Sequence, residues 1–224
     1  MSMYLSLTDK CNMRCAHCLF SCTGKGSFMT VEVFEKALDI AKEYSMDITL
    51  GGGEPTLHPQ FLKWTMQAVL ATVETSMEQD CPAVVVITNG KKTEVALTLA
   101  KLAHLGVVQA ELSQDEWHEY IDPQVVKEFS RYKVKEYGTT SKSLARIRTV
   151  NRIVARGRAA ENYLGDHDEC GCSCLFIAPN GDFYRCGCKK TKLGNLLTDE
   201  IPKSLRENLD ECEVSFAEKE LTPA

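Results

Sequence analysis

Three cysteines near the start of the chain have the spacing of a metal-binding group. Cys11, Cys15 and Cys18 form the pattern C-x3-C-x2-C. Thiolates are soft ligands, and compact cysteine runs hold iron–sulfur clusters. Because a [4Fe–4S] cluster contains four irons, three protein thiolates leave one iron open to a substrate or cofactor. Taken alone, the triplet also permits a zinc site.

A glycine-rich stretch provides a second chemical signal. Gly51, Gly52 and Gly53 are followed by Glu54 and a proline, directly after a short strand expected at 47–50. Consecutive glycines let the backbone approach a ligand closely and adopt positive φ angles, and the glutamate adds an acceptor. By themselves, the glycines would also suit a tight turn.

These two motifs together resemble those of the radical S-adenosylmethionine (radical SAM) superfamily. The resemblance implies that the three cysteines hold a [4Fe–4S] cluster whose open iron binds S-adenosylmethionine. It implies that Gly51, Gly52, Gly53 and Glu54 bind the amino group of the methionine portion. The activity expected from this resemblance is reductive cleavage of S-adenosylmethionine to a 5′-deoxyadenosyl radical, which abstracts hydrogen from a substrate.

Polar residues that follow two later strands extend the expected site. Asn89 and Ser113 occupy places where members of this family contact the ribose or the methionine carboxylate, although both are also ordinary turn residues. Asp115 and His118 are candidates for proton exchange with the substrate, or members of a polar surface loop. Arg158 is a further candidate for binding the carboxylate.

A second group of cysteines lies near the C-terminus. Two β-like runs around Asn180-Gly181 predict a hairpin with cysteines at both bases. The pattern resembles the SPASM or twitch extensions of radical SAM enzymes, which bind auxiliary [4Fe–4S] clusters. We expect one auxiliary cluster, with zinc as the alternative. Its four ligands would come from Cys170, Cys172, Cys174, Cys186, Cys188 and Cys212.

The elements that must position these residues alternate between strands and helices. Strands are expected at 3–7, 47–50, 83–88, 107–112 and 146–150, with helices between them. One helix should begin near Pro59 and bury Leu62, Met66, Val69 and Val73. Such alternation favours a parallel sheet whose active site lies at the carboxyl ends of its strands. The resemblance implies an α/β fold: a partial, open (β/α)6 TIM-like barrel over 1–160. A small cysteine-rich extension over 161–224 would contain a β-hairpin and a helix.

Composition limits the classes of protein. The chain has 224 residues, is 44% hydrophobic and has no apolar run long enough to span a bilayer. Its 11 cysteines are clustered, which favours metal binding in a reducing compartment over disulfides. We therefore expect a cytoplasmic protein without a signal peptide or membrane partner. The net charge of −5 gives no reason to expect a nucleic-acid partner.

The substrate is less sharply defined by the sequence than the cofactors. A peptide or protein side chain is the first expectation, because many SPASM and twitch enzymes modify peptides. A nucleoside or other small molecule is the second, with slight support from a basic stretch at 131–158. A non-catalytic iron–sulfur protein for electron transfer or redox sensing is the third. An enzyme of this class would need an external electron donor such as flavodoxin or ferredoxin.

Overall fold

One eight-stranded sheet organises the chain. The computed structural model describes residues 2–131, 135–136, 139–140, 144–150, 153–165, 174–189 and 191–199. Five strands run parallel in the order of the chain, each bonded to the next, as expected from the alternating pattern. They are β1 (Ser2–Thr8), β2 (Asp47–Gly52), β3 (Val84–Thr88), β4 (Gln109–Ser113) and β7 (Ala145–Arg148).

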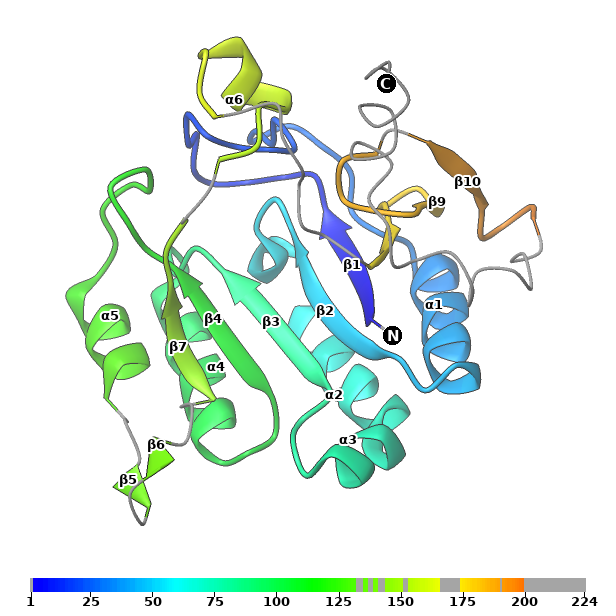
Figure 1. The fold of residues 1–224 in the computed structure, drawn as a ribbon, viewed down its shortest axis with the longest axis horizontal. Helices are drawn as coiled ribbons and strands as arrows, with labels where there is room; N and C mark the ends of the chain where they lie inside the picture. Colours follow the sequence, from blue (N-terminus) through cyan, green and yellow to red (C-terminus); the bar gives the residue numbers. More distant parts are fainter. Residues whose placement is uncertain are drawn as a thin grey trace, which may run out of the picture.

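The helices that connect the parallel strands lie on one side of the sheet, behind the strands in Figure 1, whereas the short helix at Gly157–Glu161 lies above their carboxyl ends. Thr30 caps the first of them, since its side chain accepts a hydrogen bond from the Val33 amide. Asp122 caps α5 in the same way through the Gln124 amide. The helices are α1 (Val31–Glu43), α2 (Phe61–Ala71), α3 (Val73–Gln79), α4 (Thr93–His104), α5 (Pro123–Ser130) and α6 (Gly157–Glu161), with a 3-10 turn at Pro55–Leu57.

The C-terminal strands extend the same sheet beyond β1. Strand β8 (Leu175–Ile177) pairs parallel with β1, and β9 (Asp182–Tyr184) returns antiparallel around the expected Asn180-Gly181 turn. Strand β10 (Lys192–Asn195) follows at the edge. A two-stranded ribbon, β5 (Lys135–Glu136) with β6 (Thr139–Thr140), lies apart from this sheet. The helix expected after residue 195 falls largely on residues outside the described ranges.

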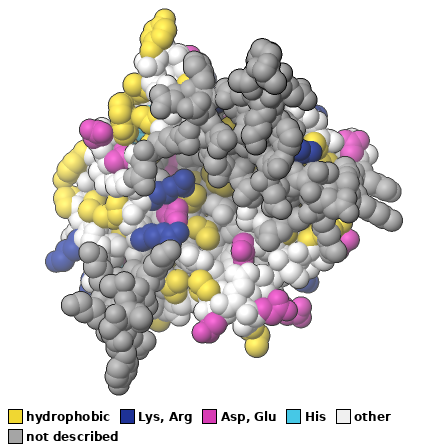
Figure 2. Space-filling model, viewed as in Figure 1, with side chains coloured by type: hydrophobic (Ala, Val, Ile, Leu, Met, Phe, Trp, Pro, Cys, Tyr) yellow, Lys and Arg dark blue, Asp and Glu magenta, His cyan; other side chains and the backbone are white. Residues whose placement is uncertain are grey.

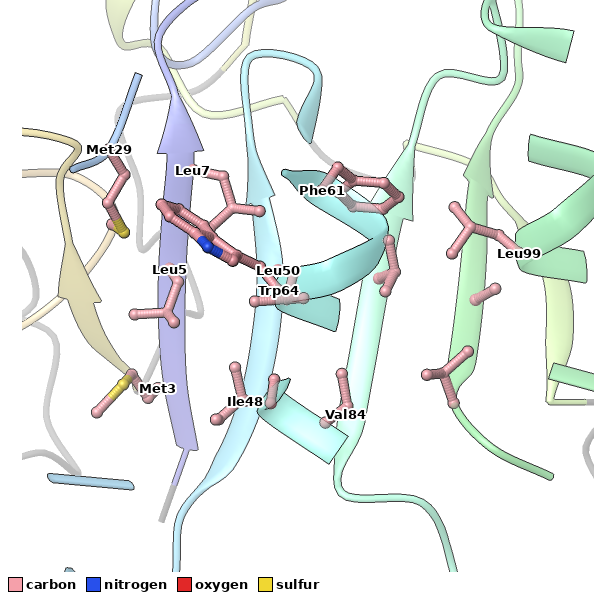
Figure 3. Close-up of a cluster of buried hydrophobic side chains, with 14 of the residues drawn as sticks. Met3, Leu5, Leu7, Met29, Ile48, Leu50, Phe61, Trp64, Val84 and Leu99 are labelled. Atoms are coloured by element: carbon pink, nitrogen blue, oxygen red, sulfur yellow. The ribbon is translucent and has the colours of Figure 1, made fainter. Parts of the chain in front are cut away.

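The hydrophobic core lies between the sheet and the helices. Alternate residues of the strands point into it, as the period-2 pattern of a strand requires. Figure 3 shows Leu5 and Leu7 of β1 beside Ile48 and Leu50 of β2, with the Trp64 ring close to them. The Trp64 ring stacks on Phe34 with centroids 4.2 Å apart, which joins α2 to α1. Because these side chains are buried against the helices, the alternate side chains of each strand face the opposite side of the sheet.

The buried face predicted for the second helix was wrong. Leu62 and Met66 are each 40% exposed, whereas Phe61, Trp64, Thr65 and Ala68 are buried. The bulky aromatic pair Phe61 and Trp64, at i and i+3, turns the helix by about one position relative to the expected stripe. The helix also ends at Thr72, and Val73 begins the separate helix α3.

The expected fold class is confirmed: a mixed α/β protein with an open sheet rich in parallel strands. All five parallel strands of the barrel were located to within a few residues of their observed bounds. Among the described residues, no helix has the length and apolar character needed to cross a bilayer. The carboxyl ends of the strands point toward the loop that carries the first three cysteines (Figure 1).

Candidate active site

The cysteine loop leaves the end of β1 and folds back on itself before α1. Backbone hydrogen bonds close it: the Asp9 amide donates to Ser27, the Cys11 amide to Thr23 and the Met29 amide to Leu7. Cys11, Cys15 and Cys18 are all partly exposed within this loop. The closure therefore presents three thiols at the rim formed by the carboxyl ends of the strands.

The three thiols of the loop differ in pKa. Cys18 is held near a thiolate state: a hydrogen bond from the Cys22 thiol, backbone amides and the charge of Arg158 lower its pKa to about 5. Burial raises the pKa of Cys11, and it raises that of Cys15 to about 11. Only thiolates bind metal, so cluster assembly must release protons from Cys11 and Cys15.

The three glycines at the end of β2 are needed for close packing against β1 and the residues that follow it. A Cβ on Gly51 would lie 2.1 Å from the Tyr4 hydroxyl oxygen, and one on Gly53 would lie 2.2 Å from the Lys10 carbonyl oxygen. Gly52 has a φ of +121°. The Gly53 amide also donates to the Thr8 carbonyl at 2.8 Å. The glycines thus bind the end of β2 to the start of the cysteine loop, and Gly52 and Gly53 remain partly exposed there.

Substituting Gly53 tests this packing. We expect Gly53→Ala to push apart the cysteine loop and β2, because the clash is with backbone and cannot be relieved by a rotamer change. Iron bound per chain after anaerobic reconstitution should fall well below the wild-type value. Gly24→Ala is the matched control in the same loop, since a Cβ there meets nothing within 4 Å. Equal iron contents in the two variants would contradict this account.

Glu54 is fully buried and joins two segments through its carboxylate. One oxygen, Oε1, accepts from the Thr56 amide and hydroxyl and from the Thr88 hydroxyl, at 3.2, 2.6 and 2.8 Å. The other, Oε2, accepts from the Asn89 amide at 2.7 Å. Burial raises the pKa of Glu54, and these four hydrogen bonds oppose that shift. The carboxylate therefore ties the end of β3 to the glycine turn, rather than pointing into open space.

Replacing Glu54 with glutamine should be costly. The amide would place N–H donors against groups that already donate, leaving buried donors unsatisfied at about 1–3 kcal/mol each. We expect Glu54→Gln to lower the free energy of unfolding by roughly 2 kcal/mol or more, measured by urea denaturation. Glu35→Gln, on the exposed face of α1, should change it little. A Glu54→Gln protein as stable as this control would show that the network is unimportant.

Asn89 lies between the glycine turn and the cysteine loop. Its side-chain Nδ2 atom donates to the Asn12 side chain at 2.9 Å and lies 3.7 Å from the Cys11 sulfur. Ser113, at the end of β4, is partly buried and is paired in register with Arg148. The structure thus brings the cysteine loop, the glycine turn and Asn89 together at the carboxyl ends of β1, β2 and β3.

Asp115 and His118 face the cysteine loop from the turn after β4. Asp115 accepts from His118 at 2.6 Å, from the Trp117 amide at 3.0 Å and from the Val150 amide at 2.8 Å. Partial burial alone would raise the pKa of Asp115, but these hydrogen bonds lower it below its usual value. Asp115 therefore organises its loop and is a weak proton donor near neutral pH.

The His118 ring contacts the cysteine loop itself. It lies edge-on to the ring of His17, with centroids 4.9 Å apart. Burial lowers the pKa of His17, so this ring is neutral near pH 7. Within the described part of the chain, His17 Nδ1 and the Gln114 side-chain oxygen are buried without a hydrogen-bond partner. Such orphaned polar atoms near the rim fit a site that takes a polar ligand.

Helix α6 clamps the cysteine loop, a feature that the sequence did not reveal. The buried Arg158 guanidinium donates to the Cys15 carbonyl at 3.0 Å and to the Cys22 carbonyl, and its backbone amide donates to the Cys18 carbonyl. Asn162 donates to the Ala16 carbonyl at 3.0 Å. Arg158 was only a candidate for binding a carboxylate, and its guanidinium donates to the loop backbone here.

Gly157 permits this clamp. Its φ is +53°, and a Cβ there would lie 2.3 Å from the Leu19 carbonyl oxygen. The Gly157-Arg158 pair is the only signal in the sequence that could have indicated the contact. It did not, because a dipeptide carries no information about a partner more than 130 residues away.

Of the described C-terminal cysteines, Cys186 and Cys188 flank a turn that contacts Phe20 of the cysteine loop, whereas Cys174 lies at the amino end of β8. Gly187, between Cys186 and Cys188, packs against the rings of Phe20 and Phe176, with a Cβ placed 3.7–3.8 Å from them. The Lys189 ammonium lies over Phe176 at 4.9 Å and over Phe20 at 5.2 Å. Cys174 precedes β8 directly. Cys170, Cys172 and Cys212 lie outside the described residues.

The residues at the rim fit the expected cofactors. Three thiols on one short loop form the soft donor set of an iron–sulfur cluster. Partly exposed glycine backbone, the Asn89 side chain and two orphaned polar atoms surround that loop. No other part of the described chain brings a cysteine triplet next to a glycine-rich turn.

A comparison with known families decides the family. The family model described as the Radical SAM superfamily matches residues 5–164, which include the cysteine loop, the glycine turn and helix α6. This chain belongs to the radical SAM superfamily. Its cofactors are therefore a [4Fe–4S] cluster and S-adenosylmethionine, and it is an enzyme.

Curated relatives match shorter parts of this radical SAM chain. The S-adenosylmethionine-dependent nucleotide dehydratase of Thermoplasmatales archaeon (strain ISO4-H5) is 41% identical over 59 residues, covering 26% of this chain and 21% of the relative. The GTP 3′,8-cyclase of Haemophilus influenzae (strain PittEE) is 31% identical over 126 residues, covering 54% of this chain and 34% of the relative. The chain thus spans about a third or less of these relatives.

Solved structures share the radical SAM fold over nearly the whole chain. BtrN in complex with AdoMet and 2-DOIA superposes with a TM-score of 0.63 at 12% identity, covering 98% of this chain and 86% of that one. The structure of anSMEcpe with bound AdoMet and the Cp18Cys peptide gives 0.57 at 14% identity, covering 96% and 81%. At these identities the likeness concerns the fold.

Proposed function

We propose that this enzyme cleaves S-adenosylmethionine reductively at the rim described above and abstracts hydrogen from a substrate held on the concave face of the sheet. One observation carries the proposal. The side-chain Nδ2 atom of Asn89 lies 3.7 Å from the Cys11 sulfur, so the cysteine loop meets the ends of β2 and β3 at a single place. An electron carrier has no need of the adjoining glycine turn.

Each group at the rim has a distinct part in this function. When bound, the cluster supplies one electron that splits S-adenosylmethionine into methionine and a 5′-deoxyadenosyl radical. Cys11, Cys15 and Cys18 hold the cluster, and the backbone around Gly52 and Gly53 takes the amino group of the cofactor. Asn89 and Ser113 contact its ribose or carboxylate. Asp115 and His118 position the cysteine loop through His17, and His118 is the better candidate for proton exchange.

The test uses the whole chain, reconstituted anaerobically with iron and sulfide and reduced with dithionite. Incubation with S-adenosylmethionine should yield 5′-deoxyadenosine and methionine in equal amounts, measured by liquid chromatography and mass spectrometry. In place of dithionite, flavodoxin or ferredoxin with its reductase should support the same cleavage. A reduced, cluster-loaded protein that forms no 5′-deoxyadenosine would overturn the proposal.

For the substrate, we favour a small phosphorylated molecule over a peptide. The curated relatives that match the chain are named for reactions on nucleotides. The concave face carries two arginines on β7, whose guanidinium groups suit phosphate. The fold also accommodates peptides in a neighbour, so a peptide substrate stays the second candidate. Candidate substrates would be compared by the rate at which they accelerate formation of 5′-deoxyadenosine.

We also propose that the extension at 161–224 holds an auxiliary metal. Support comes from Cys186 and Cys188, which flank a turn packed on Phe20, two residues beyond the cluster ligand Cys18. A [4Fe–4S] cluster is preferred, and a four-thiolate zinc site is the alternative. Iron and zinc would be counted per chain in wild type and in Cys186→Ala. If Cys186→Ala loses zinc alone, the zinc site is correct. If its iron and zinc contents equal those of wild type, the proposal of an auxiliary metal is wrong.

A further inference from the structure

The face of the sheet opposite the helices carries an uneven set of charges. Along β4, Ala110 and Leu112 are buried toward the helices, so Glu111 and Ser113 point to the other side. Along β7, Ala145 is buried and Arg146 and Arg148 share the side of Glu111. Figure 2 shows basic and acidic side chains next to one another on this face, over β4 and β7.

One carboxylate serves two guanidinium groups here. Register places Arg146 directly opposite Glu111 and Arg148 opposite Ser113. The Arg146 Nε atom donates to Glu111 at 2.9 Å, and Arg148 Nη1 lies 3.6 Å from the second Glu111 oxygen. The side chains of Arg146 and Arg148 are 42% and 53% exposed, whereas that of Glu111 is only 12% exposed. One positive charge is thus unbalanced, and both arginines keep donors turned to solvent.

The residues of β1, β2 and β3 that lie in register with Glu111 and with Gln109 form two rows across the sheet. Neither row adds a negative charge opposite the arginines. In register with Glu111 are Ile87 of β3, Gly51 of β2 and Ser6 of β1. The row below contains Tyr4, Thr49, Val85 and Gln109, all uncharged. Among strands β1 to β4, Glu111 is therefore the one carboxylate on the inward positions of these two rows, and Arg148 lies nearer the rim, level with Ser113.

Arg146 and Arg148 share their side of the sheet with Tyr4 of β1. Strands β1 and β7 are separated by three others, which in a flat sheet would place them about 19 Å apart. Burial raises the pKa of Tyr4 to about 12, and the positive charge of Arg148 opposes that shift. Arg148 thus lies on the side of the sheet that Tyr4 faces. Its level along the strand is that of Ser113, at the rim that carries the cysteine loop.

From this geometry we propose that Arg146 and Arg148 bind the phosphates of a nucleoside triphosphate substrate on the concave face. This inference rests on the proposed function and names its substrate class. Guanidinium groups bind phosphate oxygens in bidentate fashion. Residues two apart on a strand are about 7 Å apart, a separation that a di- or triphosphate chain can bridge. Glu111 holds both side chains in place on the face until the ligand arrives.

Binding is measured by titration calorimetry on the cluster-loaded full chain, without S-adenosylmethionine. The probes are tripolyphosphate, the four ribonucleoside triphosphates, and guanosine as an uncharged nucleoside. We expect at least one triphosphate to bind and guanosine to bind much more weakly. Arg148→Gln and Arg146→Gln should each weaken triphosphate binding about tenfold or more, and Arg148→Lys should restore part of it. Arg131→Gln, which removes the same charge at the end of α5, is the control.

Other outcomes overturn the inference. Triphosphate binding that is equal in Arg148→Gln and Arg131→Gln would do so, as would preferential binding of an acidic peptide over every triphosphate. S-adenosylmethionine has its own carboxylate, so its affinity is measured in parallel; a loss confined to it would assign Arg148 to the cofactor. Glu111→Gln keeps both cations and should bind triphosphate at least as tightly as wild type, and weaker binding would count against the arginines.

The proposed function is tested separately from this inference. Formation of 5′-deoxyadenosine by wild type with dithionite alone requires no triphosphate. If wild type cleaves S-adenosylmethionine but binds no triphosphate, the inference fails and the function stands. If wild type binds triphosphate through the arginines but yields no 5′-deoxyadenosine when loaded and reduced, the function fails and the anion site stands.

Discussion

Changing Cys11, Cys15 or Cys18 singly to alanine should remove about four irons per chain and abolish cleavage of S-adenosylmethionine. All three thiols lie on one loop, and a cluster that has lost one of three ligands is not retained by the remaining two. Iron and sulfide would be assayed after anaerobic reconstitution, with 5′-deoxyadenosine measured on the same samples. The loss should be complete rather than partial, because the cluster needs all three thiolates of the triplet.

The matched control is Cys81→Ala. Cys81 lies between α3 and β3, and its amide bonds to the Ser76 carbonyl far from the rim. Its substitution should leave iron content and cleavage at wild-type values. Retention of a full cluster with normal cleavage in any variant of the triplet would refute the ligand assignment.

Arg158→Ala should release the cysteine loop. The substitution removes two charge-assisted hydrogen bonds to the carbonyls of Cys15 and Cys22, each worth about 1.5–3 kcal/mol. We expect the free energy of unfolding to fall by about 3 kcal/mol or more, and cleavage of S-adenosylmethionine to slow about tenfold or more. The Michaelis constant for S-adenosylmethionine and the electron paramagnetic resonance spectrum of the reduced cluster would both be recorded.

Two further variants separate positioning from simple destabilisation. Arg156→Ala removes an exposed arginine from the same segment and should behave as wild type. Arg158→Lys can reach only one of the two carbonyls and should recover part of the cleavage rate. An altered resonance spectrum in Arg158→Ala, under conditions where the protein is still folded, would indicate a displaced loop. An unchanged spectrum with unchanged kinetics would contradict the clamp.

Local patterns predicted most of the fold, because they depend on neighbouring residues. Strand β3 was expected from an apolar run bounded by turn residues, and helix α1 from Thr30 and the apolar spacing after it. The face of α2 was misassigned because Phe61, Trp64, Leu62 and Met66 all offer apolar surface. Which of these sides is buried depends on Phe34 of α1, and the period of the helix alone cannot choose.

The candidate site shows the same division. The cysteine spacing and the glycine turn are continuous in the chain, and both were located from it. Glu54 was expected to face the cofactor, whereas its carboxylate is occupied by Thr56, Thr88 and Asn89. The contacts of Arg158 also come from distant segments. Those contacts depend on the packing of strands and of α6 that are far apart in the chain, and a short motif does not encode this packing.

The contacts between Arg158 and the cysteine loop can form only late in synthesis of the chain. Arg158 follows Cys15 by 143 residues, and β8, the partner of β1, comes later still. At about 5–20 residues per second, roughly 7–30 s pass between the emergence of the thiols and that of the arginine. During this interval the loop can be held by its own backbone bonds and by earlier partners such as Gly53 and Asn89, but not by α6. The contacts of Arg158 with the cysteine loop are therefore among the last to form as the chain is made.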